Sequence, residues 1–280
     1  MSPKSAELPS VSNQRTVPPT TSTELVLFFR QISAVSEADL RKLIHDPVEL
    51  LTRMVQPLLW LTIFGQVFAR TRAIPTGGIP YLDFMAPGIL AQSVLFGAIF
   101  FGISLIWERD LGIVHKFLVS PAPRSALVLG RVLSSAIRAL IQTVMVYGIT
   151  WVLGIHLRFS VPAILGVIIT VSLGAAVFST FSLVVACVVK SRERFMGIGQ
   201  VLTMPLFFAS NAIYPLEMMP NWLKTVSRFN PLTYQVDALR ALMIQGGHST
   251  FGFGFDCLAQ GLVLAILVTI AAKLYPNIVT

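Results

Sequence analysis

The residues of this chain best equipped for an interaction lie between Trp107 and Arg131, in the stretch WERDLGIVHKFLVSPAPRSALVLGR. Charged and apolar side chains alternate within a few positions there, and the prolines at 121 and 123 stiffen the chain that follows. Such a segment can place apolar groups in a groove of another protein while its charges orient the contact. The alternative is an ordinary solvated loop. The preceding block, 84–106, contains no Asp, Glu, Lys or Arg.

Residue patterns typical of enzymes are absent from the sequence. It contains no GxxxxGK[ST] phosphate loop, no HExxH, no CxxC and no GxSxG. The histidines, His45, His115, His156 and His248, are scattered over different segments. We therefore predict no catalytic residues, no metal site and no cofactor bound by this chain.

The elements around the charged stretch are long and apolar. Hydrophobic residues make up 54% of the 280 residues and charged residues only 12%, and the mean hydropathy is +0.74. A soluble domain carries roughly twice that charged fraction, and blocks of about twenty apolar residues are long enough to cross a bilayer. The sequence predicts an all-α polytopic membrane protein with spans at about 50–68, 84–106, 127–153, 161–189, 197–214 and 257–274.

The net charge of +8 fits membrane topology better than nucleic-acid binding. With the N-terminus inside, 12 lysines and arginines fall in inner segments and 6 in outer ones. This bias predicts that both termini are cytoplasmic. We expect the plasma (inner) membrane of a bacterium, with a plastid or thylakoid membrane as the alternative.

Two further segments flank or interrupt the spans. Residues 1–23 are rich in Ser, Thr and Pro and are predicted to be a disordered tail. Glu24 to His45 shows helical apolar spacing with several charges, which favours an amphipathic helix on the inner membrane surface or one packed on the protein's own cytoplasmic side. The segment from Tyr214 to Phe255, between the last two spans, contains two short amphipathic patterns. We expect helices that dip into the outer leaflet there; an ordered external cap is the alternative.

The third predicted span carries a polar stripe at helical spacing, formed by Arg131, Ser134, Arg138 and Gln142. Charge deep in a membrane is unfavourable unless it faces protein or water. Snorkelling toward the inner interface would serve Arg131 well and Arg138 less well. We therefore expect the stripe to face the bundle and to position the inner loop.

Two blocks resemble a known family. The first contains Glu108, Arg109, Gly112, the run Lys116–Pro121, Arg124 and Arg131, and the second runs from Asn211 through Tyr214-Pro215, Trp222, Asn230-Pro231 and Tyr234 to Asp237 and Arg240. Together they resemble the type-2 permease subunits of ATP-binding-cassette exporters, in particular daunorubicin-type drug efflux and nodulation lipo-oligosaccharide export permeases, with cyanobacterial and plastid relatives. The resemblance covers residues 24–280, as one transmembrane domain.

The resemblance implies a role for each block. Trp107 to Lys116 would be a coupling helix that docks on an ATPase subunit, with contact residues Trp107, Glu108, Arg109, Asp110, Gly112, Lys116, Pro121 and Arg124. The outer block would form re-entrant helices, with Tyr214, Pro215, Trp222, Asn230, Pro231, Tyr234, Asp237 and Arg240 as its marker residues. Two permease copies would act with two ATPase subunits, which would bind ATP and Mg. The Glu24 to His45 helix would be the family's interface helix.

The family's pathway lies between the two permease copies, near the first, second and fifth spans. Those spans carry the aromatic residues Trp60, Phe64, Phe96, Phe100, Phe207 and Phe208, which suit a hydrophobic or amphipathic cargo such as a drug, lipid or glycolipid. Each could equally be a packing or lipid-facing residue. An ion-gradient-driven carrier is the alternative function, but no carboxylate is expected near the membrane midplane. A lipid-modifying enzyme would need a nucleophile or an acid–base pair that the sequence lacks.

Overall fold

The computed structural model describes residues 30, 33, 36, 37, 41, 47–72, 74–111, 124–189 and 191–274. The elements in this part of the chain are helical: α2 (Pro47–Leu59), the π-helix η1 (Trp60–Phe64), α3 (Gly65–Thr71), α4 (Tyr81–Asp110), α6 (Arg124–Val152), α7 (Val161–Val188), α8 (Arg192–Phe208), the 3₁₀ turn η2 (Leu216–Met218), α9 (Asn221–Phe229), α10 (Pro231–Met243) and α11 (Phe253–Leu274). The predicted all-α class is confirmed for these residues. The predicted tail and most of the predicted 24–45 helix lie outside them. The five described residues between 30 and 41 are helical.

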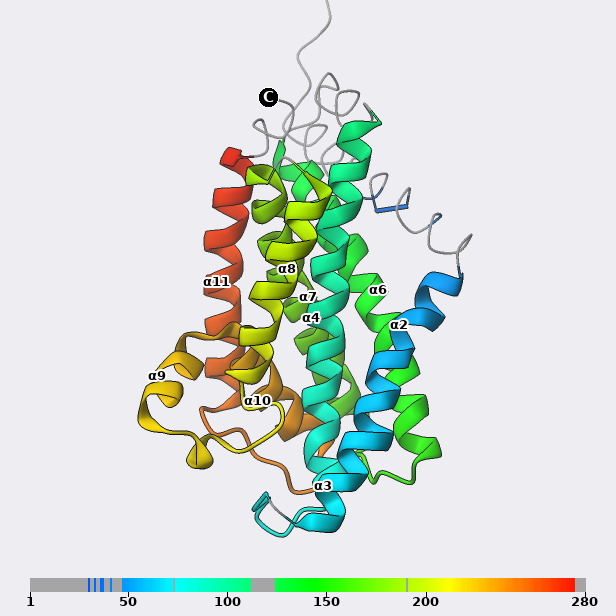
Figure 1. Ribbon diagram of the computed structural model, residues 1–280, viewed down its shortest axis with the longest axis vertical. Helices are drawn as coiled ribbons and strands as arrows, with labels where there is room; N and C mark the ends of the chain where they lie inside the picture. The colour runs from blue at the N-terminus through cyan, green and yellow to red at the C-terminus, as the bar shows by residue number, and fades with distance from the viewer. Residues whose placement is uncertain are drawn as a thin grey trace, which may run out of the picture.

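The long helices run side by side along the long axis of the molecule (Figure 1). Helix α7 packs against α4, α6, α10 and α11, and α4 also packs against α2 and α8. We call the end at which α4 and α11 finish and α8 begins the upper end, and the end that carries α9 and α10 the lower end, as they stand in Figure 1.

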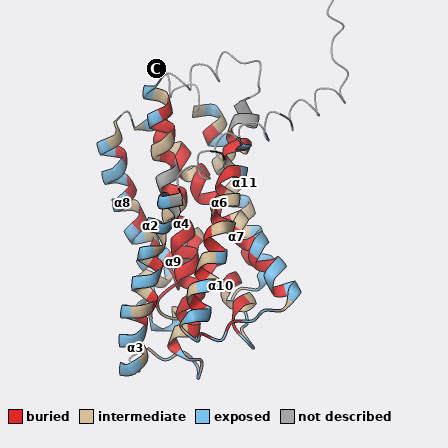
Figure 2. Cartoon of the chain, turned by 90° about the vertical axis from the view of Figure 1, so that its right-hand side faces the viewer, coloured by how far each residue is buried: buried red, intermediate tan, exposed pale blue. Residues whose placement is uncertain are grey.

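Burial is concentrated in the middle of this bundle (Figure 2). The outer helices instead expose apolar stripes. On α11 the exposed residues Leu258, Leu262, Ile266 and Ile270 recur every four positions, on one face of the helix. Helices satisfy their own backbone hydrogen bonds, so such faces can lie in lipid without exposing polar groups. The chain is therefore built to be surrounded by a bilayer.

Four helices are long and apolar enough to cross a membrane: Tyr81–Asp110, Val128–Val152, Val161–Val188 and Phe253–Leu274. They correspond to the second, third, fourth and sixth predicted spans. The first predicted span falls on α2, η1 and α3, where Pro57 precedes a π-helical turn. A proline removes one backbone donor and a π-turn widens the helix, so the run is divided into short helices. The fifth falls on α8, which has 17 residues and ends at Phe208, short of the predicted 214. Six spans thus remain a prediction.

Close helix packing depends on glycine at two positions of α4. A Cβ at Gly88 would lie 2.2 Å from the carbonyl oxygen of Ala212, and one at Gly102 would lie 2.2 Å from Oγ of Ser182 on α7. That Ser182 hydroxyl donates to the carbonyl of Ile99, at 2.8 Å. Helix α4 can approach its neighbours this closely only because both positions lack a side chain.

Candidate functional site

The last turn of α4 carries Trp107, Glu108, Arg109 and Asp110 at the upper end of the bundle. The sequence suggested that a separate short helix begins at Trp107, but α4 continues from Tyr81 to Asp110 without a break. No proline or glycine lies between Ile103 and Asp110 to end it earlier. Trp107 and Leu111 expose about half and two thirds of their surface, 49% and 68%. The upper end therefore presents apolar side chains beside charged ones.

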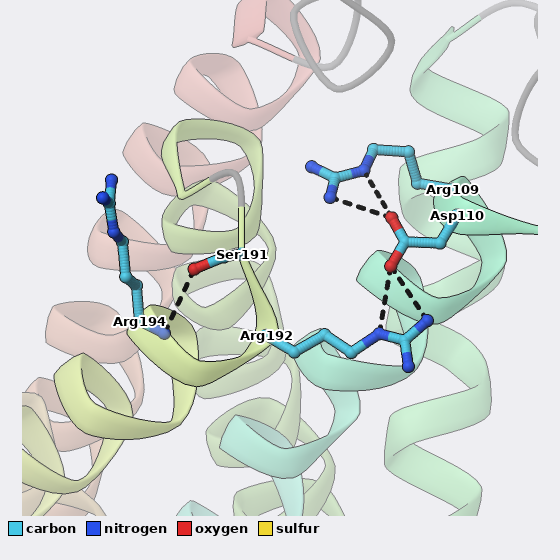
Figure 3. A network of polar contacts seen from close by, with 5 residues as sticks. All are labelled: Arg109, Asp110, Ser191, Arg192 and Arg194. Atoms are coloured by element: carbon cyan, nitrogen blue, oxygen red, sulfur yellow. Dashed lines mark hydrogen bonds and ion pairs between the residues drawn. The ribbon is translucent and has the colours of Figure 1, made fainter.

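Asp110 joins α4 to α8. Arg109 and Arg192 converge on its carboxylate (Figure 3): Nη2 of Arg109 lies 2.9 Å from Oδ1, and Nη2 of Arg192 lies 2.9 Å from Oδ2. The Arg192 guanidinium also stacks 3.8 Å from the centre of the Trp107 ring, a favourable cation–π contact. Ser191 caps α8 by accepting a hydrogen bond from the backbone N–H of Arg194. Arg192, the next residue, extends toward Asp110 of α4 (Figure 3).

Glu108 joins α4 to α6. Its carboxylate forms an ion pair with Arg131, and both side chains are buried. Arg131 therefore faces the protein rather than the inner interface. Two nearby residues of α4, Glu108 and Asp110, thus bind two different helices.

The other residues of the polar stripe lie on the same side of α6. Ser134 and Gln142 are buried and Arg138 is half-buried. The neighbouring Ser135 donates to the carbonyl of Ala175 on α7, at 3.5 Å. These side chains are turned toward the bundle; that the stripe positions the inner loop remains a prediction. Of the remaining predicted contact residues, Arg124 begins α6, while Gly112, Lys116 and Pro121 lie outside the described residues.

A cavity of about 380 Å³ lies between α2, α4 and α8. Its walls include Phe96 of α4 and Phe195 of α8, and its polar groups include Gln56 of α2 with Gln200 and Thr203 of α8. Apolar walls with a few polar groups are typical of sites for drug-sized ligands. Helices α4 and α8, which Asp110 joins, are also two walls of this cavity.

Four of the predicted pathway residues form one aromatic cluster, on η1 and the end of α8. The Trp60 ring stacks on Phe64 with centroids 4.5 Å apart and meets Phe207 edge-on at 5.4 Å and Phe208 at 6.5 Å. Phe64 and Phe208 are about half exposed, whereas Phe207 is fully buried. Phe96 lies in the cavity wall instead, and Phe100 is described only as a residue of α4.

At the lower end, α10 is buried among α4, α7 and α11. Asn230 caps it, because its Oδ1 accepts from the N–H of Leu232 at 3.0 Å while its Nδ2 donates to the carbonyl of Leu206 at 2.6 Å. Pro231 follows at the first helical position, where its missing N–H is harmless. Val236, Leu239 and Met243 of this helix are buried against protein, so the bundle covers their apolar face. The predicted dip of α10 into the outer leaflet remains a prediction.

Arg240 connects α10 to two other segments. Its Nη2 donates to the carbonyl of Asn211 at 2.6 Å, and its guanidinium lies 3.9 Å from the centre of the Phe84 ring. Burial lowers the pKa of Arg240 to about 10, which still leaves it protonated at neutral pH.

Tyr214 precedes Pro215 and η2, and its hydroxyl donates to the carbonyl of Phe208. Tyr234 donates in the same way to the carbonyl of Arg228.

Helix α9 is the exposed member of the lower end. Trp222, Val226 and Phe229 expose 69%, 47% and 84% of their surface. They recur at helical spacing on one face. Contact with the outer leaflet therefore remains a prediction for α9.

Sequence reasoning did not assign roles to Arg192, Ser249 or Thr250. Arg192 is the partner of Asp110, and the two hydroxyls bind Asp237 of α10. The position of Arg192 directly after Ser191 was the available signal, because a serine before a charged turn marks a helix start.

The sequence is similar to those of known membrane transport proteins. A model of the ABC-2 type transporter family matches residues 30–244. The chain is 29% identical over 231 residues to a transport permease, ycf38, of Cyanophora paradoxa, covering 79% of this chain and 78% of the relative. It is 27% identical over 238 residues to the daunorubicin resistance ABC transporter permease protein DrrB1 of Streptomyces coeruleorubidus, covering 83% and 81%. It is also 26% identical over 205 residues to nodulation protein J of Rhizobium leguminosarum bv. trifolii, covering 71% and 74%.

Proposed function

Because this chain belongs to the ABC-2 type transporter family, we propose that it is the membrane permease of an exporter driven by a separate ATPase subunit. Two copies of the permease form the pathway, and two ATPase subunits bind ATP and Mg at the upper end. The upper end is the cytoplasmic side in this proposal, and the protein is oriented with both termini in the cytoplasm. The cargo is hydrophobic or amphipathic, which agrees with the largely apolar cavity between α2, α4 and α8.

The observation that carries this proposal is the set of side-chain contacts that connects the end of α4 to α6 and α8. Asp110 and Trp107 hold Arg192 of α8, and Glu108 holds Arg131 of α6. A subunit that moves the tip of α4 therefore also moves α8, and α4 and α8 line the cavity. Movement imposed at the upper end can therefore be transmitted through these contacts to the cavity in which the cargo would bind.

The exposed tip supplies the docking surface. Leu111 and Trp107 provide apolar area, and Arg109 and Asp110 provide charge to orient the contact. A helix end that presents both apolar and charged side chains can bind in a groove on a partner protein. Helix α9 lies in the lower part of the molecule, away from this surface (Figure 1).

Copurification tests the docking surface. Leu111→Glu places a charge in the apolar contact, so the tagged permease should retain much less of its cognate ATPase than the wild type does. Val152→Glu is the matched control, since Val152 is an equally apolar, 77% exposed residue at the other end of the bundle, and it should retain the ATPase. Equal retention by both variants would contradict docking at the tip of α4.

A further inference from the structure

Two buried carboxyl groups meet at one hydroxyl near the lower end of the bundle. Asp237 lies on α10 and Asp256 in the first turn of α11, and both are completely buried. Ser249 lies in the loop that joins the two helices. Its Oγ is 2.9 Å from Oδ2 of Asp237 and 2.7 Å from Oδ2 of Asp256.

The two contacts between the Ser249 hydroxyl and the carboxyl groups need one more hydrogen atom than the hydroxyl and two ionised acids contain. A serine hydroxyl donates one hydrogen bond and accepts up to two. Oγ of Ser249 already accepts from the backbone N–H of Gly252, at 2.7 Å. If the hydroxyl donates to one carboxylate, its contact with the other is a hydrogen bond only if that acid carries a proton.

The surroundings of the two acids differ. Asp237 accepts from the hydroxyls of Ser249 and Thr250 and from the backbone N–H of Phe251, at 2.9, 3.0 and 3.1 Å. Three donors stabilise an ionised carboxylate. Asp256 has only the contact with Ser249, and its second oxygen, Oδ1, is buried without a partner among the described residues.

The charged groups near the two acids also favour ionisation of Asp237 over ionisation of Asp256. On α10, Arg240 interacts electrostatically with Asp237 and with Glu217 of η2. The titratable groups that reach Asp256 are Asp237, Tyr234 of α10 and Cys257 of α11, and no described lysine or arginine forms an ion pair with it. Helix α7, which packs on both helices, contains no Asp, Glu, Lys or Arg.

We propose that Asp256 binds a proton and, as a neutral acid, donates a hydrogen bond to Ser249, so that Asp237, Ser249 and Asp256 form a one-proton site. Asp237 is the ionised member and accepts the serine proton. The site connects α10 to α11 through the intervening loop. When the pH rises enough, Asp256 releases its proton to water; one hydrogen bond is lost and two carboxylates face one hydroxyl. The hydrogen-bonded connection between α10 and α11 is thus complete at lower pH and is broken at higher pH.

Infrared difference spectroscopy of the full chain in lipid nanodiscs tests this site. The spectrum at neutral pH should contain a carboxylic-acid C=O band that Asp256→Asn abolishes and Asp237→Asn retains. Ser249→Ala removes the bridging hydroxyl, so it should keep the band but shift it to higher frequency. Hydrogen exchange of residues 246–252, corrected for the intrinsic rate, should increase with pH in the wild type and lose this dependence in Asp256→Asn.

Three results would overturn the proposal. A spectrum unchanged by Asp256→Asn would show that this acid is ionised. Loss of the band in Asp237→Asn, with a folded protein and the Ser249→Ala band still present, would assign the proton to the other acid. A band that appears only when sodium is replaced by a large organic cation would show that the pair binds sodium instead.

Discussion

Glu108 and Arg131 illustrate how a single contact can hold the upper end of the bundle together. Only 7% and 4% of their side chains are exposed, so each charge is stabilised by the other in a site with little water. Burying a paired charge is close to neutral, whereas removing one partner takes compensation away from the other. Leu105, Ile106 and Val128, which belong to one small buried apolar cluster, are within three positions of the pair along α4 and α6.

We predict that Glu108→Gln lowers the free energy of unfolding by about 3–5 kcal/mol, the typical effect of breaking a buried ion pair. The double variant Glu108→Leu/Arg131→Met should recover most of this loss, because it removes both buried charges of the pair. Glu193→Gln, at an exposed position of α8, serves as the control. Denaturant unfolding in micelles measures all of them, and a double variant less stable than Glu108→Gln would refute this explanation.

At the scale of elements, the packing of α4 on the chain around Ala212 depends on Gly88. A side chain there meets backbone atoms, which cannot rotate away as a side chain can. Overpacking of this kind typically costs about 1–3 kcal/mol, and here the backbone itself has to move.

Gly88→Val should therefore lower the thermal unfolding midpoint markedly, whereas Gly148→Val should change it little. Gly148 is also helical, lies on α6 and has open space where a Cβ would lie, with no atom of another segment within 4 Å, so it controls for helix propensity. The two midpoints are compared in the same detergent. Similar midpoints for the two variants would show that α4 does not approach Ala212 this closely.

Apolar runs predicted α4, α6, α7 and α11 well, because their boundaries depend on local composition. The block without charge from 84 to 106 lies inside Tyr81–Asp110, for example. The partners of charged residues were not predictable in the same way: Arg192 and Asp110 are 82 positions apart, and only the packing of α8 on α4 brings them together. The burial of α10 was missed for the same reason, since an amphipathic pattern does not specify whether lipid or protein covers the apolar face.

At the scale of the whole molecule, one series of contacts runs from the exposed tip of α4 to the cavity. Leu111 and Trp107 face outward, Asp110 binds Arg192, and α8 continues from Arg192 to Gln200 and Thr203 in the cavity wall. The ABC-2 type transporter family implies an ATPase partner, and our proposal places the energy source for transport in that second subunit.

The most direct test is the amount of amphipathic probe transported per ATP hydrolysed, in vesicles that contain the permease and its ATPase. Daunorubicin is a suitable first probe, given the relative named for resistance to it. Arg192→Gln should retain hydrolysis but lower this ratio about fivefold, at the lower end of typical coupling between sites, while the exposed neighbour Arg194→Gln should match the wild type. Full transport by Arg192→Gln, or transport by the permease alone on an ion gradient, would contradict the account.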